Sequence, residues 1–560
     1  MKKYIVSLAV ATLTLSSVTS CIEEYEPEGY GSYVTTDQAA QAPGAFDNFV
    51  KNITSSLGGQ FTYSGSSQYP WDYGYTSFFQ QRDVMGQDIA LANSGSWFQS
   101  WYTCGVGLGP RYAVCQLPWT YYYGWIKSCN TVLSLGGEEP EEKFKSGEGI
   151  AYAMRAMFYM DLARMYAPET YAKNPEALTI PKITEKGTED MYNNPRMTNK
   201  EAFEFILSDL DKAEEYLAGY KRENKYTPDL SVVYGLKARA YLTMEDWANA
   251  EKYAKLAQQG YTEMTGEEYT SKTTGFNTAN NAWMFAYHFN SEDPNLRDND
   301  GDSSWASQMI VEIGGDKGNA GYAANYGYPL LIDRHLYETI PATDYRKNCF
   351  VDFNIDNLKS NAEKLEALAK YSNEPSYILK AGAAATTYGG KVGGLPVKFR
   401  PMNGACDQPM ATAGAVDVPL MRVEEMKLIE IEAAGMQNES KGIEMLTEFA
   451  KKRDPQYVYG NHNEAYGNTS TSKFQNEVWW QRRVELWGEG FATFDIKRLN
   501  KGIIRSYAGT DHFDGYQWNT TTVPDWMTLC IVGSEADVNH ALVNNPTPIA
   551  PTENSTPYAW

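Results

Sequence analysis

The stretch WWQRRVELWGEGFATFDIKRLNKG, residues 479–502, raises the question on which the interpretation of the whole chain depends. It places charged side chains among large aromatic ones: Arg482, Arg483, Glu485, Glu489 and Asp495. Such a mixture can form an active site, or it can hold a helical scaffold together. Glu485 and Glu489 lie four residues apart, which puts them on one helix face within reach of the arginines one turn earlier. Gly488 and Gly490 predict a tight contact or a helix end, so we interpret the stretch as structural.

Segments elsewhere in the chain repeat one theme, two amphipathic helices joined by a short turn. In residues 231–261, Tyr234, Ala238 and Leu242 have helical spacing, and Asp246 is placed to cap a second helix. The alanines permit close helix packing, as in a tetratricopeptide repeat. We expect such pairs near residues 147–220, 231–261, 420–453 and 473–500, stacked into a scaffold with a continuous core. The predicted fold class is therefore mainly α.

Long segments of another character separate these pairs. Residues 61–125 contain aromatic residues about twice as often as the whole chain, in which they make up 14%. Residues 262–330 are rich in Gly, Asn and Asp and also contain tryptophans and tyrosines. Loops of such length are usually functional or disordered, and the aromatic content argues against disorder. We expect these two segments to form a loop-rich, aromatic-rich half that carries the ligand.

The N-terminus has the features of a secretion signal. Residues 1–20 combine two lysines with an apolar run that is too short to span a bilayer. The run ends at VTSC, which resembles a bacterial lipobox and predicts lipidation of Cys21. Acyl chains on Cys21 would hold the protein at a membrane. The alternative is ordinary signal cleavage near a chance cysteine. Residues 21–35 are acidic and are interpreted as a flexible tether.

Composition excludes several classes of protein. The chain has 560 residues, a net charge of -21 and a pI near 4.8, so a nucleic-acid partner is not expected. Apart from Cys21, six cysteines remain without a CxxC pair, and the five histidines are scattered, so neither a zinc site nor a cofactor is predicted. Cys104 and Cys115 could form a disulfide, and free buried thiols are the alternative.

Several motifs together resemble the SusD/RagB family. They occur in the family's order: the lipobox with its acidic tether, residues 118–133, residues 153–169, residues 417–435, residues 482–498 and NHALVNNP at 539–546. The family comprises surface lipoproteins of Bacteroidetes that bind glycans beside TonB-dependent transporters. The resemblance implies one SusD-like domain over residues 36–560, a lipid anchor in the outer membrane with the body exposed at the cell surface, and a SusC-like TonB-dependent transporter as partner. It also implies that the 482–498 motif is scaffold.

The expected ligand is a nutrient glycan, an oligo- or polysaccharide. Sugars pack a C–H face on aromatic rings and present hydroxyl groups to polar side chains at the edge. Candidate ligand-binding residues in the two aromatic-rich segments are Trp71, Tyr73, Tyr75, Arg82, Asp83, Gln87, Asp88, Asn93, Trp97, Trp101, Trp305, Tyr326 and Tyr328. We expect several of them to share one shallow surface. For each aromatic residue the alternative is core packing.

Other functions are weighed against glycan binding. A peptide or another nutrient could be bound by the same transporter-partner architecture. A glycoside hydrolase would need two carboxylates facing each other, and Asp83 and Asp88 are the best loop candidates. However, no recognised catalytic motif appears, so the protein is not expected to be an enzyme. Calcium binding at residues 292–302 is an open alternative, although the spacing does not match an EF-hand loop.

Overall fold

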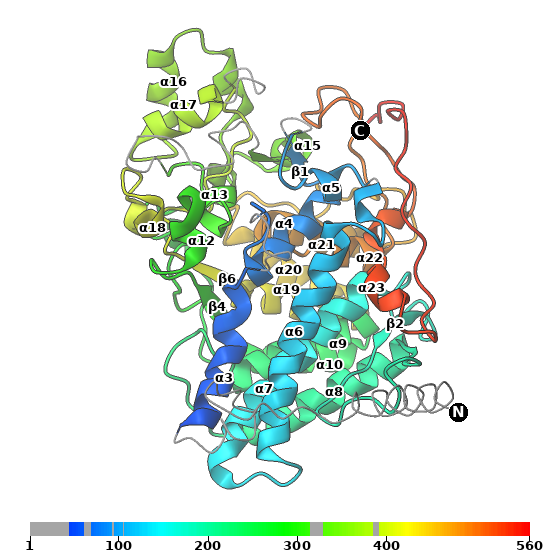
Figure 1. Cartoon of the computed structure of the whole chain (residues 1–560). Coiled ribbons are helices and arrows are strands. Elements are labelled where there is room, and N and C mark those ends of the chain that lie inside the picture. Colours follow the sequence, from blue (N-terminus) through cyan, green and yellow to red (C-terminus); the bar gives the residue numbers. More distant parts are fainter. Residues whose placement is uncertain (1–43, 61–68, 92–94, 105, 314–328, 385–390) are drawn as a thin grey trace, which may run out of the picture. The chain divides into compact units, whose positions relative to one another are not determined.

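The computed structural model describes residues 44–60, 69–91, 95–104, 106–313, 329–384 and 391–560 (Figure 1). Residues 46–560 form one compact unit. The predicted signal peptide, the lipidation of Cys21 and the acidic tether lie outside the described residues. Among the residues that are described, no helix is both long and apolar enough to cross a bilayer.

Long helices form the scaffold of residues 46–560. They pack as neighbours in the order α6 on α7, α7 on α8, α9 on α10, α10 on α19, and α19 on α20 and α21 (Figure 1). Their bounds are α6 Ala113–Gly136, α7 Glu142–Tyr166, α8 Asn199–Tyr216, α9 Leu230–Met244, α10 Trp247–Ala257, α19 Val423–Gln437, α20 Glu439–Lys451, α21 Lys473–Glu485 and α22 Ala492–Leu499. Helices therefore occur in all four segments in which the sequence predicts pairs, and the mainly α fold class is confirmed.

Local sequence signals determine where several of these helices begin. The Asp246 carboxylate accepts a hydrogen bond from the backbone N–H of Asn249, which confirms the predicted cap of α10. Thr198 and Glu201 form a reciprocal capping box at the start of α8. Helix α7 ends at Tyr166, two residues before Pro168, because proline disfavours helical backbone at the preceding residue. These boundaries follow from local chemistry alone.

Shorter helices occupy the aromatic-rich segments. The prediction of long loops is therefore wrong in part, because residues 61–125 contain several helices, including the first half of α6. The remaining α-helices are α3 Ala45–Ser55, α4 Ser77–Val84, α5 Gln99–Tyr102, α11 Gly266–Tyr269, α12 Pro294–Arg297, α13 Trp305–Met309, α15 Arg334–Thr339, α16 Asn361–Leu368, α17 Pro375–Ala384, α18 Met410–Ala413 and α23 Gly533–Ala536. The 3-10 helices are η1 Ser56–Gly58, η2 Gly74–Thr76, η3 Val106–Leu108, η4 Asp298–Gly301, η5 Tyr345–Cys349, η6 Phe353–Asn357, η7 Met402–Gly404 and η8 Asp525–Met527.

The described strands form antiparallel pairs of two strands each. These are β1 Ile89–Leu91 with β5 Leu330–Ile332, β2 Leu178–Pro181 with β3 Arg196–Thr198, and β4 Trp283–His288 with β6 Asp417–Arg422. In the first pair, Ile89 lies opposite Ile332 and Leu91 opposite Leu330. This pair joins the segment after α4 to the segment before α15, and it therefore connects the two parts of the chain in which the sequence predicts ligand contacts.

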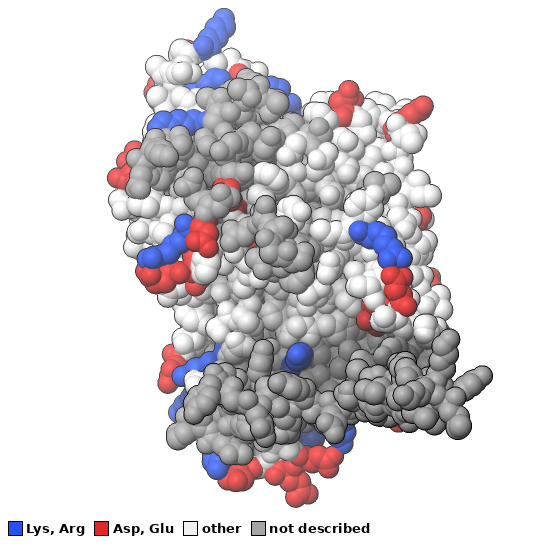
Figure 2. All heavy atoms as spheres, in the orientation of Figure 1, with Lys and Arg blue, Asp and Glu red and all other residues white. Residues whose placement is uncertain are grey.

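Apolar side chains of the described residues gather in one main core and two smaller clusters. The main core runs through the long helices and the aromatic-rich segments. One small cluster lies under α16 and α17 and includes Leu368 and Ile378, and the other joins α19, α20 and α21. On the face shown in Figure 2, charged side chains lie mainly at the margins, and the described surface between them is mostly uncharged.

Candidate functional site

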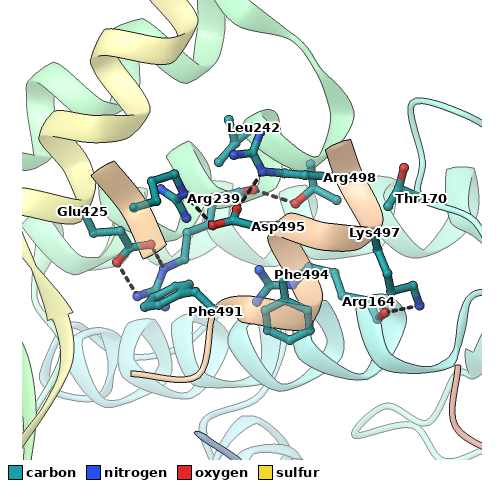
Figure 3. Close-up of a pocket in the computed structure, with 12 residues that line it drawn as sticks. Arg164, Thr170, Arg239, Leu242, Glu425, Phe491, Phe494, Asp495, Lys497 and Arg498 are labelled. Atoms are coloured by element: carbon teal, nitrogen blue, oxygen red, sulfur yellow. Dashed lines mark hydrogen bonds and ion pairs between the residues drawn. The ribbon is translucent and has the colours of Figure 1, made fainter. Parts of the chain in front are cut away.

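The charged motif at residues 482–498 is a buried network of ion pairs. The Asp495 carboxylate accepts a hydrogen bond from Arg498 at 2.8 Å (Figure 3) and another from Arg482 at 2.7 Å. Arg498 also contacts Glu432 on α19. The neighbouring cavity, which Arg164 and Arg239 also line, has a volume of about 20 Å³. That volume admits a water molecule but no sugar ring.

Glu485 is the centre of a second group of ion pairs. Its carboxylate contacts Arg346 and Arg422 at 3.2 Å each and Arg453 at 2.9 Å. Burial opposes ionisation, but the positive charges of these three arginines hold the pKa of Glu485 well below its usual range. All these groups are almost completely buried. The interpretation of the motif as scaffold is confirmed.

The predicted polar site residues on and after α4 belong to the same scaffold. Asp83 accepts hydrogen bonds from the backbone N–H groups of Gly490 at 2.9 Å and Ala492 at 3.1 Å. Arg82 donates to the Gly490 carbonyl, and Asp88 pairs with Arg483 at 2.6 Å. Arg82, Asp83, Gln87 and Asp88 are at most 6% exposed. They lie in the core instead of on a ligand-binding surface. Arg82 and Asp83 fix α4 to the turn between α21 and α22, and Asp88 pairs with α21 itself.

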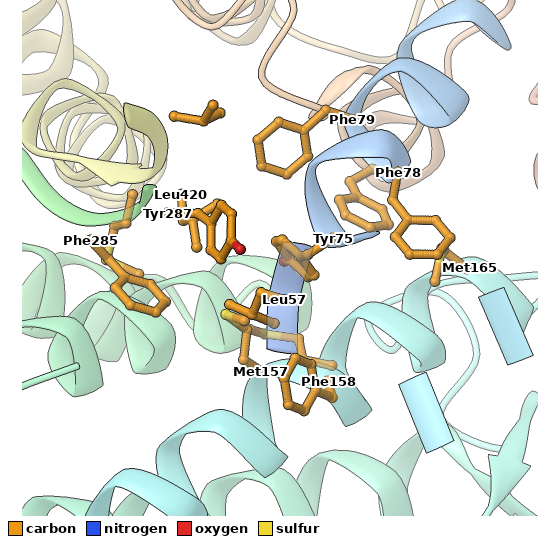
Figure 4. Packing of buried hydrophobic residues seen from close by; sticks show 14 of the residues in the cluster. Leu57, Tyr75, Phe78, Phe79, Met157, Phe158, Met165, Phe285, Tyr287 and Leu420 are labelled. Atoms are coloured by element: carbon orange, nitrogen blue, oxygen red, sulfur yellow. The ribbon is translucent and has the colours of Figure 1, made fainter. Parts of the chain in front are cut away.

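Three predicted aromatic residues also fill the core. Tyr73 is fully buried, Tyr75 donates a hydrogen bond to Asp161 at 2.7 Å, and Trp305 lies edge-on to Phe399 at 4.9 Å. Figure 4 shows Tyr75 among other buried rings and aliphatic side chains of the main core. The structure therefore corrects the expectation that these rings lie on an open surface. The Tyr75 ring contacts Phe79 on α4, Tyr122 on α6 and Phe158 on α7, so its hydrophobic area stabilises the packing of these three helices.

The predicted residues Trp71 and Trp101 form one group of rings with Tyr69 and Phe98, and the predicted Trp97 directly precedes Phe98 in the chain. We call these five residues the Tyr69 cluster. Tyr69 stacks on Trp71 with ring centroids 4.7 Å apart and an angle of 5° between the rings. Trp71 meets Trp101 edge-on at 5.6 Å, and Trp101 contacts Phe98 at 5.8 Å. Tyr69 is 37% exposed and Trp97 is half-buried, whereas Trp71, on which Tyr69 stacks, and Trp101 are buried. The cluster thus presents part of its aromatic surface to solvent on a rigid base.

A hydrogen bond connects the Tyr69 cluster to the second predicted ligand segment. The Ser303 hydroxyl donates to the Tyr69 carbonyl at 2.9 Å. Phe79 on α4 contacts Trp305 on α13 edge-on at 6.1 Å. The two aromatic-rich segments, about 230 residues apart in the sequence, therefore lie side by side. This juxtaposition makes the Tyr69 cluster the strongest candidate for a ligand-binding site.

Comparison with known protein families identifies the fold. A model of the SusD family matches residues 244–547, which is more than half of the chain. The chain belongs to the SusD family. A second model, described as "Starch-binding associating with outer membrane", matches residues 72–242. Comparison with curated proteins gives no match.

Solved structures of other SusD-like proteins share this fold. A SusD-like carbohydrate binding protein from Bacteroides vulgatus is 22% identical, with a TM-score of 0.64 over 89% of this chain and 97% of its own. A SusD superfamily protein from Bacteroides thetaiotaomicron is 18% identical, with a TM-score of 0.63 over 92% and 100%. Surface glycan-binding protein A from B. thetaiotaomicron, solved in complex with laminarihexaose, is 16% identical, with a TM-score of 0.61 over 89% and 98%.

The remaining predictions for this SusD-family chain concern three further candidate residues, a metal site and the cysteines. Asn93, Tyr326 and Tyr328 lie outside the described residues. Within the described part of the chain, no group of three or more His, Cys, Asp or Glu residues could hold a metal ion. In the stretch considered for calcium, Arg297 instead pairs with Glu292 at 2.5 Å. Cys104 and Cys115 are both free and buried, and the Cys115 thiol donates to the carbonyl of Cys530.

Tyr69 is the residue of this cluster that the sequence interpretation missed. It stands two positions before Trp71 in an aromatic-rich segment. The backbone N–H of Asp72 donates to the Tyr69 carbonyl at 2.8 Å, so residues 69–72 form a turn and not an extended strand. The stacking of Tyr69 on Trp71 arises from this turn, which the spacing of the two rings alone does not predict.

Proposed function

We propose that this SusD-family protein captures a nutrient glycan at the cell surface and passes it to a SusC-like TonB-dependent outer-membrane transporter. The observation that carries the proposal is the Tyr69 cluster, in which an exposed tyrosine ring is stacked on a base of buried tryptophans. Membership of the family supports it. So does the sugar ligand named for one related structure, surface glycan-binding protein A with laminarihexaose.

Capture is non-covalent in this proposal. A sugar C–H face packs on the Tyr69 ring, and Trp97 contacts the same ligand. Because Tyr69 already stacks on Trp71 and its carbonyl is bonded to Ser303, little conformational freedom is lost on binding. An open platform removes water from each sugar ring only in part, so the affinity of one site is modest. Many copies on one surface, or several sugar units on one chain, compensate for this.

Affinity electrophoresis of the mature chain through gels that contain a panel of polysaccharides tests the ligand class. We expect one glycan to retard the protein, and Tyr69→Ala and Trp97→Ala to abolish most of the retardation. Tyr192→Ala is the matched control, because Tyr192 is 57% exposed and lies outside the cluster. No retardation by any glycan, in a protein with native circular dichroism, would contradict the proposal. Release of reducing sugar from the glycan would contradict the non-catalytic function.

The proposed location depends on Cys21. Lipidation of this residue would hold the body at the outer membrane, where the transporter lies. Cys21→Ala should move the protein from the membrane fraction to the medium or the periplasm, and a tagged wild-type chain should copurify with a TonB-dependent transporter. Persistent membrane attachment of the variant would count against the anchor.

A further inference from the structure

A second exposed aromatic group lies at residues 558–560, and we call it the Trp560 cluster. The Trp560 ring stacks on the His335 imidazole with centroids 3.3 Å apart and an angle of 3°. Tyr558, Tyr466 and Tyr507 surround it at 5.0, 5.3 and 5.9 Å. Trp560 is 47% exposed and Tyr558 is 45% exposed. Because the imidazole covers one face of the indole, its accessible area belongs to the other face and the edges.

Hydrogen bonds from several segments hold this cluster in place. The His335 imidazole contacts the Glu464 carboxylate at 2.7 Å, and the Tyr507 hydroxyl donates to Asp333. The backbone N–H of Tyr558 donates to the Ser506 carbonyl at 2.8 Å. Asn519 and Ser506 donate further hydrogen bonds to the carbonyls of residues 556 and 555. Residues 555–558 are thus fixed to residues 506–519, and the two exposed rings stand on an ordered base.

Two large exposed rings, of which one is stacked on a second ring, can act as a sugar-binding platform. A pyranose packs its C–H face on an indole and places its hydroxyl groups at the ring edge. The polar groups of this cluster are the Tyr558 hydroxyl and the His335–Glu464 pair. The nearby carboxylates, Asp333 and Glu464, disfavour an acidic sugar by charge repulsion.

We propose that Trp560 and Tyr558 form a second glycan-binding subsite, which takes an uncharged sugar unit of the glycan bound at the Tyr69 cluster. This inference rests on the proposed function. Buried contacts connect the two sites. Trp101 of the Tyr69 cluster is followed by Tyr102, whose hydroxyl meets the His512 imidazole at 2.8 Å, and the Asp333 carboxylate lies 3.5 Å from the same imidazole. Asp333 also accepts a hydrogen bond from Tyr507, whose ring packs against Trp560.

Simultaneous contact with both sites would raise the affinity for long glycan chains without changing either site. Avidity of this kind commonly amounts to a factor of about 10² or more. A chain too short to contact both sites gains nothing from the second one. Loss of the Trp560 cluster should therefore weaken binding of the polysaccharide much more than binding of a disaccharide from the same glycan.

The test uses the mature chain and the glycan that retards it in affinity electrophoresis. Trp560→Ala and Tyr558→Ala should each raise the apparent Kd for the polysaccharide at least about tenfold, while titration calorimetry with the disaccharide gives an unchanged Kd. Trp560→Phe, which keeps a ring, should retain most of the polysaccharide affinity. Ile549→Ala is the control, because Ile549 is 87% exposed in the same C-terminal segment and has no ring.

The outcomes separate this inference from the proposed function. Equal retardation of wild type and Trp560→Ala by the polysaccharide would overturn the second subsite and leave the proposed function intact. If no glycan retards the wild-type protein in affinity electrophoresis, both the second subsite and the proposed function are overturned. Weakened binding in Ile549→Ala to the same degree as in Trp560→Ala would also overturn the subsite, since the effect would then arise from the segment and not from the rings.

Discussion

At the scale of single residues, Glu485 has the largest structural role among the carboxylates of the family motif. It pairs with arginines from three distant places in the sequence, Arg346, Arg422 and Arg453, and all four groups are buried. Removal of one partner from a buried ion pair leaves an uncompensated charge, whereas the intact pair is close to neutral in its net contribution. The loss of such a glutamate therefore destabilises the protein far more than the intact ion pairs stabilise it.

We expect Glu485→Ala to lower the free energy of unfolding by about 3–5 kcal/mol, because three guanidinium groups lose their shared partner inside the protein. Urea denaturation followed by circular dichroism measures the change. Asp537→Ala is the control, because its pair with Arg111 is exposed on both sides and should contribute almost nothing. Equal denaturation midpoints for Glu485→Ala and wild type would show that water or other groups replace the carboxylate.

The imidazole of His462 makes stability depend on pH. The ring stacks on Trp480 with centroids 3.5 Å apart, and burial lowers the pKa of His462 to about 4. The pKa of an unfolded histidine is about 6.5. Between these values the unfolded chain binds a proton that the folded protein does not, so this contribution is complete above pH 6.5 and is lost as the pH falls towards 4. The full loss amounts to about 3 kcal/mol.

His462→Gln should therefore flatten the fall in Tm between pH 6.5 and pH 4, even though it lowers the Tm at neutral pH by removing the stacked ring. Differential scanning calorimetry at several pH values in this range measures both effects. His540→Gln changes an exposed histidine and should follow the wild-type profile. If the Tm of His462→Gln falls with pH as steeply as that of the wild type, the acid sensitivity arises from other groups.

At the scale of secondary-structure elements, the turn between α21 and α22 fixes α4 in place. Gly490 has a φ of +83°, and a Cβ atom added there would lie 2.7 Å from Cδ1 of Phe79 and 2.8 Å from an Arg82 nitrogen. The turn therefore needs glycine both for its backbone conformation and for the close approach of α4. The same approach allows Asp83 to accept the N–H groups of Gly490 and Ala492.

Gly490→Ala should destabilise the protein by more than backbone strain alone. Left-handed backbone costs a residue with a Cβ atom about 1–2 kcal/mol, and overpacking against Phe79 adds about 1–3 kcal/mol. Gly219→Ala isolates the first effect, because Gly219 has a φ of +81° with no heavy atom within 4 Å of an added Cβ. Urea denaturation compares the two variants. Equal losses of unfolding free energy in Gly490→Ala and Gly219→Ala would contradict the overpacking, because α4 would then move away from the added Cβ atom at no energetic cost.

The sequence predicted those elements whose determinants are local. Asp246 and Thr198 cap helices next to them, so α8 and α10 could be predicted from a few residues. The position of Trp71 could not, because the rings that bury it, such as Trp101, come from a segment with no regular spacing relative to it. Arg82 bonds to a carbonyl 408 residues away, which no local pattern encodes. The sequence therefore indicated which segments contain the candidate site, but not which of their residues form it.

At the scale of the whole molecule, stability is unevenly distributed among the hydrophobic clusters. Helix α7 is buried along most of its length from Gly147 onward, whereas Leu368 is the only buried residue of α16. The small cluster under α16 and α17 is separate from the main core. Segments with few buried apolar contacts open at a lower free energy than the core of the same protein.

Hydrogen exchange measured by mass spectrometry should therefore show full labelling of α16 and α17 well before α7. The exchange in α20, which packs on the other small cluster through Leu446 and Phe449, should be intermediate. Protection of α16 equal to that of α7 would contradict the independent opening of this part of the molecule.

The contacts of α4 also bear on how relatives of this protein can be recombined. The two family models divide the chain near residues 242–244, in the last turn of α9. Yet Arg82, Asp83 and Asp88 on one side of that division bond to Arg483 and Gly490 on the other. A hybrid assembled from halves of two family members would separate each donor from its acceptor. Exchange of α4 together with α21 and α22, or of the surface segments alone, would keep them matched, so ligand preference is best transplanted between relatives by segments and not by halves.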